Sequence, residues 1–450
     1  MEIIVVDRAQ VFPSEPPFAA DHVLSLSSLD TDPNLNVIFR YLRVYKNRID
    51  ETRTKSPFEV ISECLSKALV PYYQFAGTLI RRRDGRLDLL CELSKGATLI
   101  KSKATRTLSS LNYLDDPASH FVEQLVYDPD IETGLCNPFV LQVTEFECGG
   151  FTLGATIHHA LCDGMGSTQF FNSMAEFARG STRSTIEPVW NRAALLGLRS
   201  PPRVQFPFDQ VLRLDKEFPP YCQMDGPVVR ECFDVKDEDL DRLKDVLLEQ
   251  SGVKFTTFEA LGAYIWSARV KVFGVPGHEN VKFAYSLNIR KLVKPPLPSG
   301  YWGNGCVPMY IQLSANELVK KPLWETAELI RKSKRNATDP YVRSFIDFQE
   351  MNFGKGITAG KGVNGFTDWR HLGHSTVDFG WGGPVTVFPL SNNIIGSTEP
   401  CFFLPYSSAN AEKNNGFKVL VCLPLHGLPA FRDEMLMLSG MDKNTMFCQQ

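Results

Sequence analysis

The chain has 450 residues, of which 43% are hydrophobic and 22% charged, and its formal net charge is −3. This composition is typical of a soluble globular protein, and the charge balance gives no sign of the strongly basic surface expected of a nucleic-acid-binding protein. A chain of this length is expected to form two domains, and it contains no apolar run of the roughly 18 residues needed to span a membrane.

The cysteines and the N-terminal residues indicate the compartment. The eleven cysteines are scattered, with no CxxC pair, and the first ten residues, "MEIIVVDRAQ", lack the basic and long apolar regions of a secretory signal. These features predict reduced thiols and a cytoplasmic location.

The first predicted helix begins near Ser56. The residues "SPFE" place Ser56 at the N-cap and Glu59 three positions later, which is the pattern of a capping box, and apolar residues then recur on one helical face. The elements predicted after it in this half are strands at 139–146 and 150–158 and a helix at about 167–179.

Residues 181–228 are proline-rich and aperiodic, so we interpret them as a connection between domains. Beyond it, Thr256 and Glu259 form a second capping-box pattern, whose helix should run to about residue 273. The glycine-rich stretch 352–365 is predicted to be a mobile surface loop. The remaining predicted elements are a leucine-rich helix at 236–252 and strands at 281–289, 307–313 and 416–423.

Strands and helices therefore alternate on both sides of the connection. This pattern predicts an α/β fold with an N-terminal domain at 1–180, a crossover linker at 181–228 and a C-terminal domain at 229–450.

The stretch "TIHHALCDGMGS", residues 156–167, is the first candidate site. His158 and His159 fall at the end of a predicted strand, Asp163 follows, and "GMG" is expected to turn the chain before the next helix. Either imidazole could act as a general base near neutral pH, yet a histidine pair taken alone is more often structural, packed and hydrogen-bonded. Metal binding is a third interpretation, although adjacent residues on a strand point to opposite faces, which disfavours joint chelation.

The stretch "DFGWGGP", residues 378–384, is the second candidate. Three glycines and two aromatic residues predict a tight turn whose aromatic side chains are anchored in apolar surroundings. Asp378 needs a partner if it is buried, because an unpaired carboxylate in the interior is costly. Arg290 is one basic candidate, but Asp163 competes for it.

Taken together, these motifs resemble the signature of the plant BAHD acyl-CoA-dependent acyltransferases, in which HxxxDG lies in the middle of the chain and DFGWG some 220 residues later. Five further stretches resemble the family in the same order, so the resemblance covers essentially the whole chain. They are "LSSLD" near the start, "PYYQFAGTL" (71–79), "PVWNR" (188–192), the "LNIR…PPLP…GN" stretch and "LPAFRDEM" (428–435).

The resemblance implies two chloramphenicol-acetyltransferase-like α/β domains, with mixed sheets flanked by helices and a solvent channel between them. Acyl-CoA would enter as co-substrate from one face and a small-molecule acceptor from the other. His159 matches the motif histidine and would deprotonate the acceptor, with no covalent enzyme intermediate. The resemblance implies no metal, no permanently bound cofactor and no nucleic-acid or membrane partner, and we expect a monomer.

The resemblance also assigns roles to other residues. Asp163 would pair with Arg290 as a structural brace rather than contact the imidazole, which the sequence alone does not decide. Thr367 and Trp369 match a T-x-W spacing found on the acceptor side of hydroxycinnamoyl transferases, so Thr367 is a candidate oxyanion donor and Trp369 a pocket wall. Packing on a strand is the alternative for both. The DFGWG residues are expected to be structural: Asp378, Gly380, Trp381 and Gly382.

Coenzyme A carries phosphates, so basic and hydroxyl groups are expected at the donor entrance. The residues "KFTT" fall where the family has its donor-site side chains, at a helix N-terminus that itself favours anions. Lys254, Thr256 and Thr257 are therefore the predicted CoA ligands, although helix capping alone could explain Thr256.

One departure from the family pattern narrows the chemical class of the expected acceptor. Shikimate-type members carry an arginine thirteen residues before the threonine, where this chain has Gly354, and the adjacent Lys355 does not replace its planar fork. An uncharged alcohol, such as a phenylpropanoid alcohol, is therefore the expected acceptor. Alternatives are N-acylation of a polyamine, a peptide-synthetase condensation domain, which shares HHxxxDG but lacks DFGWG, and a non-catalytic binding protein of the same fold.

Overall fold

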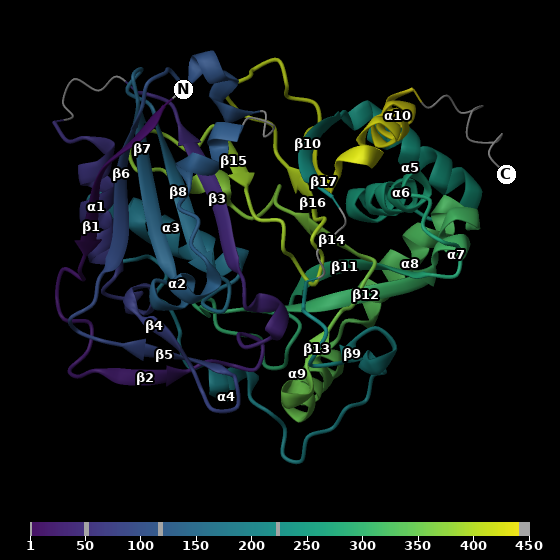
Figure 1. Cartoon of the computed structure of the whole chain (residues 1–450), viewed down its shortest axis with the longest axis horizontal. Coiled ribbons are helices and arrows are strands. Elements are labelled where there is room, and N and C mark those ends of the chain that lie inside the picture. Colours follow the sequence, from purple (N-terminus) through teal and green to yellow (C-terminus); the bar gives the residue numbers. More distant parts are fainter. Residues whose placement is uncertain (1, 49–53, 116–119, 222–225, 441–450) are drawn as a thin grey trace.

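The computed structural model describes residues 2–48, 54–115, 120–221 and 226–440, which build two halves lying side by side (Figure 1). Each half contains a twisted sheet with helices packed on it, as a two-layer α/β architecture requires. Each half also has its own core of buried apolar side chains. Among the described residues, no helix is both long and apolar enough to cross a membrane.

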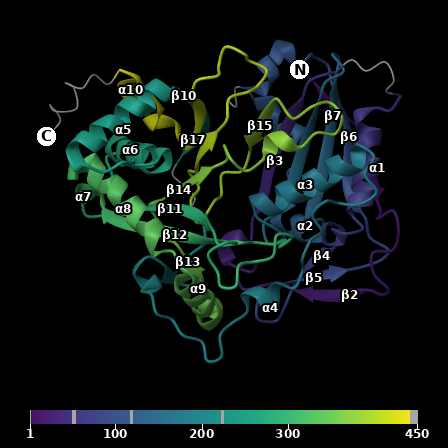
Figure 2. The same ribbon diagram turned by 180° about the vertical axis from the view of Figure 1, so that it is seen from behind.

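Six described strands form the sheet of the N-terminal half, in the order β1-β6-β7-β8-β3-β15. The sheet is mixed, because β6 and β7 run parallel while the other neighbours are antiparallel. The strands are β1 (Ile3–Val11), β3 (Ile38–Tyr45), β6 (Ala97–Ala104), β7 (Phe139–Phe146), β8 (Phe151–His158) and β15 (Thr386–Pro389). Helices α1 (Pro57–Ala68) and α3 (Gly164–Ala178) lie together on one face of this sheet (Figure 2).

The described strands of the C-terminal half form a second six-stranded mixed sheet, in the order β10-β17-β16-β14-β11-β12. Strand β14 runs parallel to both of its neighbours, so three strands end at the same edge. The strands are β10 (Val228–Val235), β11 (Asn280–Asn288), β12 (Cys306–Ser314), β14 (Val363–Asp368), β16 (Cys401–Leu404) and β17 (Phe417–Pro424). The accompanying helices are α5 (Asp237–Ser251), α6 (Thr257–Val272), α7 (Ala315–Lys320), α8 (Leu323–Asn336) and α10 (Leu428–Ser439).

Smaller elements complete the two halves. Strands β2 (His22–Ser25), β5 (Leu87–Cys91) and β4 (Thr78–Arg81) form one small sheet, and β13 (Ile357–Thr358) pairs with β9 (Arg213–Leu214). The other helices are α2 (Ile131–Cys136), α4 (Arg192–Leu196) and α9 (Asp339–Asn352), with a short 3₁₀ helix η1 at Pro33–Leu35.

Both predicted capping boxes are present. Ser56 and Glu59 exchange hydrogen bonds at the start of α1, and Thr256 and Glu259 do so at the start of α6. The helix predicted at 167–179 begins three residues earlier, at Gly164. The sequence "GMG" is therefore the first turn of α3 and not a separate turn before it.

The division of the chain into 1–180 and 229–450 needs a correction. Strand β15 belongs to the C-terminal range but pairs with β3, at the edge of the N-terminal sheet (Figure 1). The predicted linker, 181–228, also packs on the C-terminal half, because its residues Phe208 and Leu212 are buried in the C-terminal core. Pairing with the sheet edge stabilises β15 in its place, and burial of apolar area stabilises the segment that contains Phe208 and Leu212. Each half is therefore completed by residues from another part of the chain.

The prediction of a mobile surface loop at 352–365 was wrong. Residues 357–358 form β13, and β14 begins at Val363 and lies inside the C-terminal sheet between β11 and β16. Gly365 lies inside β14, and Gly360 and Gly362 lie just before it, so the sequence of this region is typical of a loop. Gly362 has φ 71°, and a Cβ there would lie 2.7 Å from the Asn280 carbonyl oxygen, so the close passage beside β11 requires glycine.

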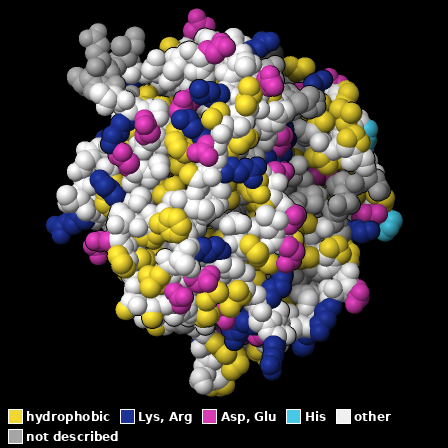
Figure 3. All heavy atoms as spheres, turned by 60° about the vertical axis from the view of Figure 1, so that its left-hand side comes forward, with side chains coloured by type: hydrophobic (Ala, Val, Ile, Leu, Met, Phe, Trp, Pro, Cys, Tyr) yellow, Lys and Arg dark blue, Asp and Glu magenta, His cyan; other side chains and the backbone are white. Residues whose placement is uncertain are grey.

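Charged side chains are mixed over the surface. On the face seen in Figure 3, lysine and arginine side chains alternate with aspartate and glutamate, with hydrophobic side chains scattered between them. This mixed distribution agrees with the formal net charge of −3.

Candidate active site

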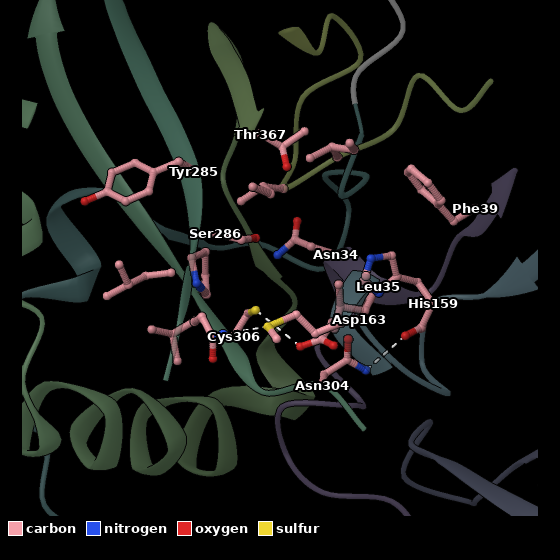
Figure 4. Close-up of a pocket in the computed structure, with 18 of the residues that line it drawn as sticks. Asn34, Leu35, Phe39, His159, Asp163, Tyr285, Ser286, Asn304, Cys306 and Thr367 are labelled. Atoms are coloured by element: carbon pink, nitrogen blue, oxygen red, sulfur yellow. Dashed lines mark hydrogen bonds between the residues drawn. The ribbon is translucent and has the colours of Figure 1, made fainter. Parts of the chain in front are cut away.

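A cavity of about 430 Å³ is lined by residues from both halves of the molecule. The N-terminal half contributes His159 and the segment from Leu29 to Phe39, which leads into β3. The C-terminal half contributes the carboxyl ends of β11 and β14, where Ser286 and Thr367 lie (Figure 4). Ligand sites commonly form where strand ends from two domains face each other.

His159 follows the last residue of β8 and is fixed through its backbone. Its amide donates to the Val37 carbonyl at 2.9 Å, and its carbonyl accepts a hydrogen bond of 2.9 Å from the Asn304 side chain (Figure 4). The ring meets the edge of Phe39, and its Nδ1 is buried with no partner among the described residues. Burial lowers the pKa of His159, so the ring is neutral and able to accept a proton at physiological pH.

His158 is turned away from this cavity, as expected for a neighbour on a strand. It is fully buried, and its Nδ1 accepts a hydrogen bond of 3.3 Å from the Ala160 amide. Burial lowers the pKa of His158 to about 3, which keeps it neutral. The structure does not bring the two rings to a common ligand, and among the described residues there is no cluster of three potential metal-binding side chains.

Asp163 joins the two halves. Its carboxylate caps α3 by accepting a hydrogen bond from the Gly166 amide, and it accepts two more from Arg290, at 2.7 and 2.9 Å, and one from the Gly305 amide. Burial alone would raise the pKa of Asp163, but the Arg290 guanidinium and these donors hold it below its usual value. Among the described residues, no hydrogen bond or ion pair connects Asp163 with His159, so the carboxylate is placed as a brace.

Thr367 and Trp369 come from the end of β14. The Thr367 hydroxyl lines the cavity and has no hydrogen bond to any residue that the structure describes, and its oxygen points into the cavity in Figure 4. Trp369 is 7% exposed, lies edge-on to Tyr41 and packs against His374 with ring centroids 4.7 Å apart. The pair therefore presents one free hydroxyl and one aromatic wall to the same space.

The DFGWG residues lie outside the cavity and pack on the N-terminal core. The Asp378 carboxylate accepts hydrogen bonds from the Gly380 and Gly382 amides, at 2.7 and 2.8 Å, so its partners are backbone groups and not Arg290. The two glycines have φ of 102° and 83°, which only glycine adopts readily. Trp381 meets Phe151 of β8 edge-on, so the turn supports the strand that leads to His159.

The predicted CoA ligands lie beside the cavity but do not line it. Thr256 is occupied as the N-cap of α6, and Lys254 is exposed. The described side chains that line the cavity near this helix N-terminus are Phe258 and Lys334. Lys334 pairs with Glu259 at 3.0 Å, and its ammonium group lies 4.8 Å from the Phe258 ring centroid.

Lys334 and Asp32 are among the cavity residues that were not foreseen. Lys334 comes from α8, 75 positions from its partner, and no sequence pattern indicates that contact. Asp32 lines the cavity from the other half of the molecule. A local signal was available for it, because aspartate followed by proline is a common helix start, and Asp32 is the N-cap of η1.

Comparison with known proteins places this chain in a family. The sequence model of the Transferase family matches residues 1–438. Taxadien-5-alpha-ol O-acetyltransferase of Taxus cuspidata is 32% identical over 440 residues, covering 97% of this chain and 96% of that protein. Spermidine sinapoyl-CoA acyltransferase of Arabidopsis thaliana is 34% identical over 426 residues, covering 92% of each chain.

Solved structures share the fold. Vinorine synthase superposes with a TM-score of 0.74 at 20% identity, covering 97% of this chain and 98% of its own. F. graminearum TRI101, solved with coenzyme A and deoxynivalenol, gives a TM-score of 0.76 at 15% identity, covering 92% and 97%. The chain belongs to this transferase family, the plant BAHD acyl-CoA-dependent acyltransferases.

Proposed function

We propose that this enzyme transfers an acetyl, benzoyl or hydroxycinnamoyl group from acyl-CoA to the hydroxyl of a plant specialised metabolite. The proposed acceptor is an uncharged alcohol, such as a phenylpropanoid alcohol, and the proposed general base is His159. The observation that carries this proposal is the position of a neutral, backbone-anchored imidazole in the same cavity as the free hydroxyl of Thr367.

The proposed reaction is a direct transfer. The acceptor hydroxyl attacks the thioester carbonyl while His159 takes its proton, which gives a tetrahedral intermediate with a negative oxygen. The Thr367 hydroxyl would donate a hydrogen bond to that oxygen. The intermediate then collapses, the carbon–sulfur bond breaks, and the CoA thiolate leaves and takes up the proton held by the imidazolium. The products are an ester and free CoA.

The lining of the cavity supports an uncharged acceptor. Among the described lining residues there is no arginine, and aromatic and aliphatic side chains such as Phe39 and Ile394 form much of the wall. Gly354, at the position of the arginine in shikimate-type members, does not line the cavity. An acceptor carboxylate would therefore meet no guanidinium fork there.

Acyl transfer to an amine is a second candidate. It is supported by one observation, the carboxylate of Asp32, which lines the cavity and has no cationic partner among the described residues. Two similar Arabidopsis thaliana proteins are named as spermidine acyltransferases, with sinapoyl-CoA and coumaroyl-CoA as donors. An amine nucleophile would use the same base and the same leaving group.

Release of the CoA thiol tests the function. The purified chain is assayed with acetyl-, benzoyl- and coumaroyl-CoA against a panel of alcohols and amines, and the products are identified by mass spectrometry. His159→Ala should lower kcat by about 10²- to 10⁴-fold, the usual contribution of a general base. Wild-type activity in this variant would contradict the proposed mechanism, and the absence of any acylated product would favour a non-catalytic binding protein.

We also propose that the enzyme works in the cytoplasm as a monomer. The described cysteines support a reducing compartment, because all nine of them are free thiols.

A further inference from the structure

Asp32 lies on the same stretch of chain that positions His159. The chain passes from Asp32 through η1 to Val37, whose carbonyl accepts the hydrogen bond from the His159 amide. Four residues, three of them in a 3₁₀ turn, lie between Asp32 and Val37, which places the two on the order of 10 Å apart. Both Asp32 and His159 line the cavity, so one small molecule could reach both.

The carboxylate of Asp32 differs from the other two in the cavity wall. Asp163 is paired with Arg290 and Asp368 with Arg370, whereas Asp32 has no ion pair with any residue in the described part of the chain. Asp32 is only 5% exposed. Burial raises its pKa, although hydrogen bonds from the Asn34 backbone and from the side chains of Asn34 and Gln349 oppose the rise.

The amides around Asp32 leave acceptors without donors. Asn34 and Gln349 both turn their NH₂ groups to the carboxylate, with hydrogen bonds of 2.9 and 2.7 Å. Their carbonyl oxygens, Oδ1 and Oε1, are then buried with no partner among the described residues. Asn34 is 4% exposed and Gln349 2%, so both oxygens are withdrawn from bulk water. Asn34 lines the cavity and Gln349 does not, so the Oδ1 of Asn34 is the acceptor that a bound hydrogen-bond donor could satisfy.

The tyrosines nearby do not supply those donors. The hydroxyl of Tyr221 donates to the backbone carbonyl of Asn34 at 2.5 Å, and that of Tyr310 donates to the backbone carbonyl of Ile395 at 3.5 Å. Both residues line the cavity, but their hydroxyls donate to backbone carbonyls and not to Asp32 or to the Asn34 side chain. The Asn34 side chain extends into the cavity between Ser286 and Leu35 in Figure 4.

We infer that Asp32, with Asn34 beside it, is an acceptor-recognition subsite for a second hydrogen-bond-donating group, a hydroxyl or an ammonium, that the acceptor carries remote from the group being acylated. The acceptor is then bifunctional: one group lies at His159 and the other at Asp32. This inference rests on the proposed function and narrows its substrate class. A site built to hydrogen-bond such a group rejects analogues that lack it, because its buried acceptors are then left unpaired.

The wild-type enzyme provides the first test. Two matched acceptor pairs are compared by CoA-thiol release: 4-hydroxycinnamyl alcohol against cinnamyl alcohol, and 1,4-diaminobutane against butylamine. The bifunctional member of one pair should have a kcat/KM higher by about tenfold or more, the value of one buried hydrogen bond. The preferred pair distinguishes a hydroxyl from an ammonium at the subsite. Equal kcat/KM within both pairs would overturn the inference.

Substitution at Asp32 provides the second test. Asp32→Asn should remove most of the discrimination within the preferred pair and leave kcat/KM for its monofunctional member within a few-fold of wild type. The control is Asp347→Asn, which alters a fully buried carboxylate of α9, two residues from Gln349, that pairs with Arg199 and does not line the cavity. Because each ratio is internal to one preparation, a loss of folded protein in either variant does not affect it.

Failure of the inference and failure of the proposed function give different results. If wild type acylates both members of a pair and Asp32→Asn lowers both equally, the subsite is excluded while the acyltransferase function stands. If no acceptor releases CoA thiol, the proposed function fails. Calorimetric binding of the same four acceptors to wild type and Asp32→Asn then still decides whether Asp32 selects the second group.

Discussion

The carboxylate of Asp163 accepts two hydrogen bonds from the guanidinium of Arg290, at 2.7 and 2.9 Å, across the boundary between the two halves of the molecule. The pair is 127 residues apart in sequence and almost fully buried on the Asp163 side. It also holds the first turn of α3, because Asp163 is the helix N-cap. The motif aspartate therefore fixes the junction that presents His159, and does not contact the imidazole.

Removing one partner of this pair should destabilise the fold rather than change the chemistry. Asp163→Asn leaves Arg290 as an uncompensated buried charge, and we expect a loss of about 3–5 kcal/mol in the free energy of unfolding. The measurement is urea unfolding followed by intrinsic tryptophan fluorescence. Activity per folded molecule should remain within about tenfold of wild type, because the neutral amide can still cap α3.

Arg290→Lys is the matched variant. It keeps the positive charge but loses the planar fork, so it should be less destabilising than Asp163→Asn. A fully stable Asp163→Asn with a displaced pH–rate profile would indicate that the carboxylate acts on His159 instead.

The pH dependence of the rate should reflect the lowered pKa of His159. Burial favours the neutral ring, and a general base must be neutral, so the active form persists below the usual histidine pKa of 6.5. We therefore expect the acidic limb of the kcat/KM profile for an alcohol acceptor to be centred below pH 6.5. The profile is measured by initial CoA-thiol release. An acidic limb centred at or above pH 6.5 would contradict the assignment.

Asp163 should affect the stability of the fold at a lower pH than the one at which His159 affects the rate. Its folded pKa lies below the ordinary value of 3.8, so its contribution to stability is complete above that value and is lost as the pH falls through the folded pKa. The buried histidines lower the stability at a higher pH than Asp163 does. Below pH 6.5 the unfolded chain binds protons on His158 and His159, whereas burial lowers the pKa of both rings in the folded state. Preincubation at each pH, followed by assay at pH 7.5, separates reversible titration from unfolding.

Loss of the Thr367 hydroxyl should lower kcat and leave KM almost unchanged. The hydroxyl is the free donor at the end of β14, and removing one oxyanion donor typically costs about 10²- to 10³-fold in kcat. Thr367→Val keeps the shape of the side chain and should show that loss with little change in KM. Thr367→Ser retains the hydroxyl and should recover most of the rate. A Thr367→Val variant with wild-type kcat would leave the residue a role in packing only.

Much of this site was accessible from sequence because its determinants are local. Ser56 and Glu59 form one capping box, and His159 and Asp163 belong to one short motif, so spacing alone identifies these residues. It does not decide whether Asp163 contacts the imidazole or Arg290. The contact between Asp32 and Gln349 spans 317 positions and depends on how α9 packs beside η1. Strand β14 was also missed because its position depends on pairing with β11 and β16, and its glycine-rich sequence has no strand pattern of its own. Long-range packing decided those features.

Lys334 should contribute to binding of the acyl-CoA donor. It lines the cavity beside the N-terminus of α6, where a phosphate would meet both an ammonium group and the positive end of the helix. Lys334→Ala should raise KM for acyl-CoA by about tenfold, the value of one charge-assisted hydrogen bond, with kcat almost unchanged. The control is Lys254→Ala, which removes an exposed lysine outside the cavity and should change KM less. The reverse order would return the donor role to Lys254.

The turn at Asp378 should prove structural. Its carboxylate satisfies two backbone amides of glycines held at positive φ, and the turn carries Trp381 against the strand that leads to His159. Asp378→Ala removes both hydrogen bonds and should lower the free energy of unfolding by about 1.5–3 kcal/mol, since the acceptor is charged. Asp378→Asn keeps the accepting oxygen and should lose less. Thermal unfolding compared with kcat per folded molecule measures both effects. A stable Asp378→Ala with strongly reduced kcat would instead place this carboxylate in the reaction, 219 positions after His159.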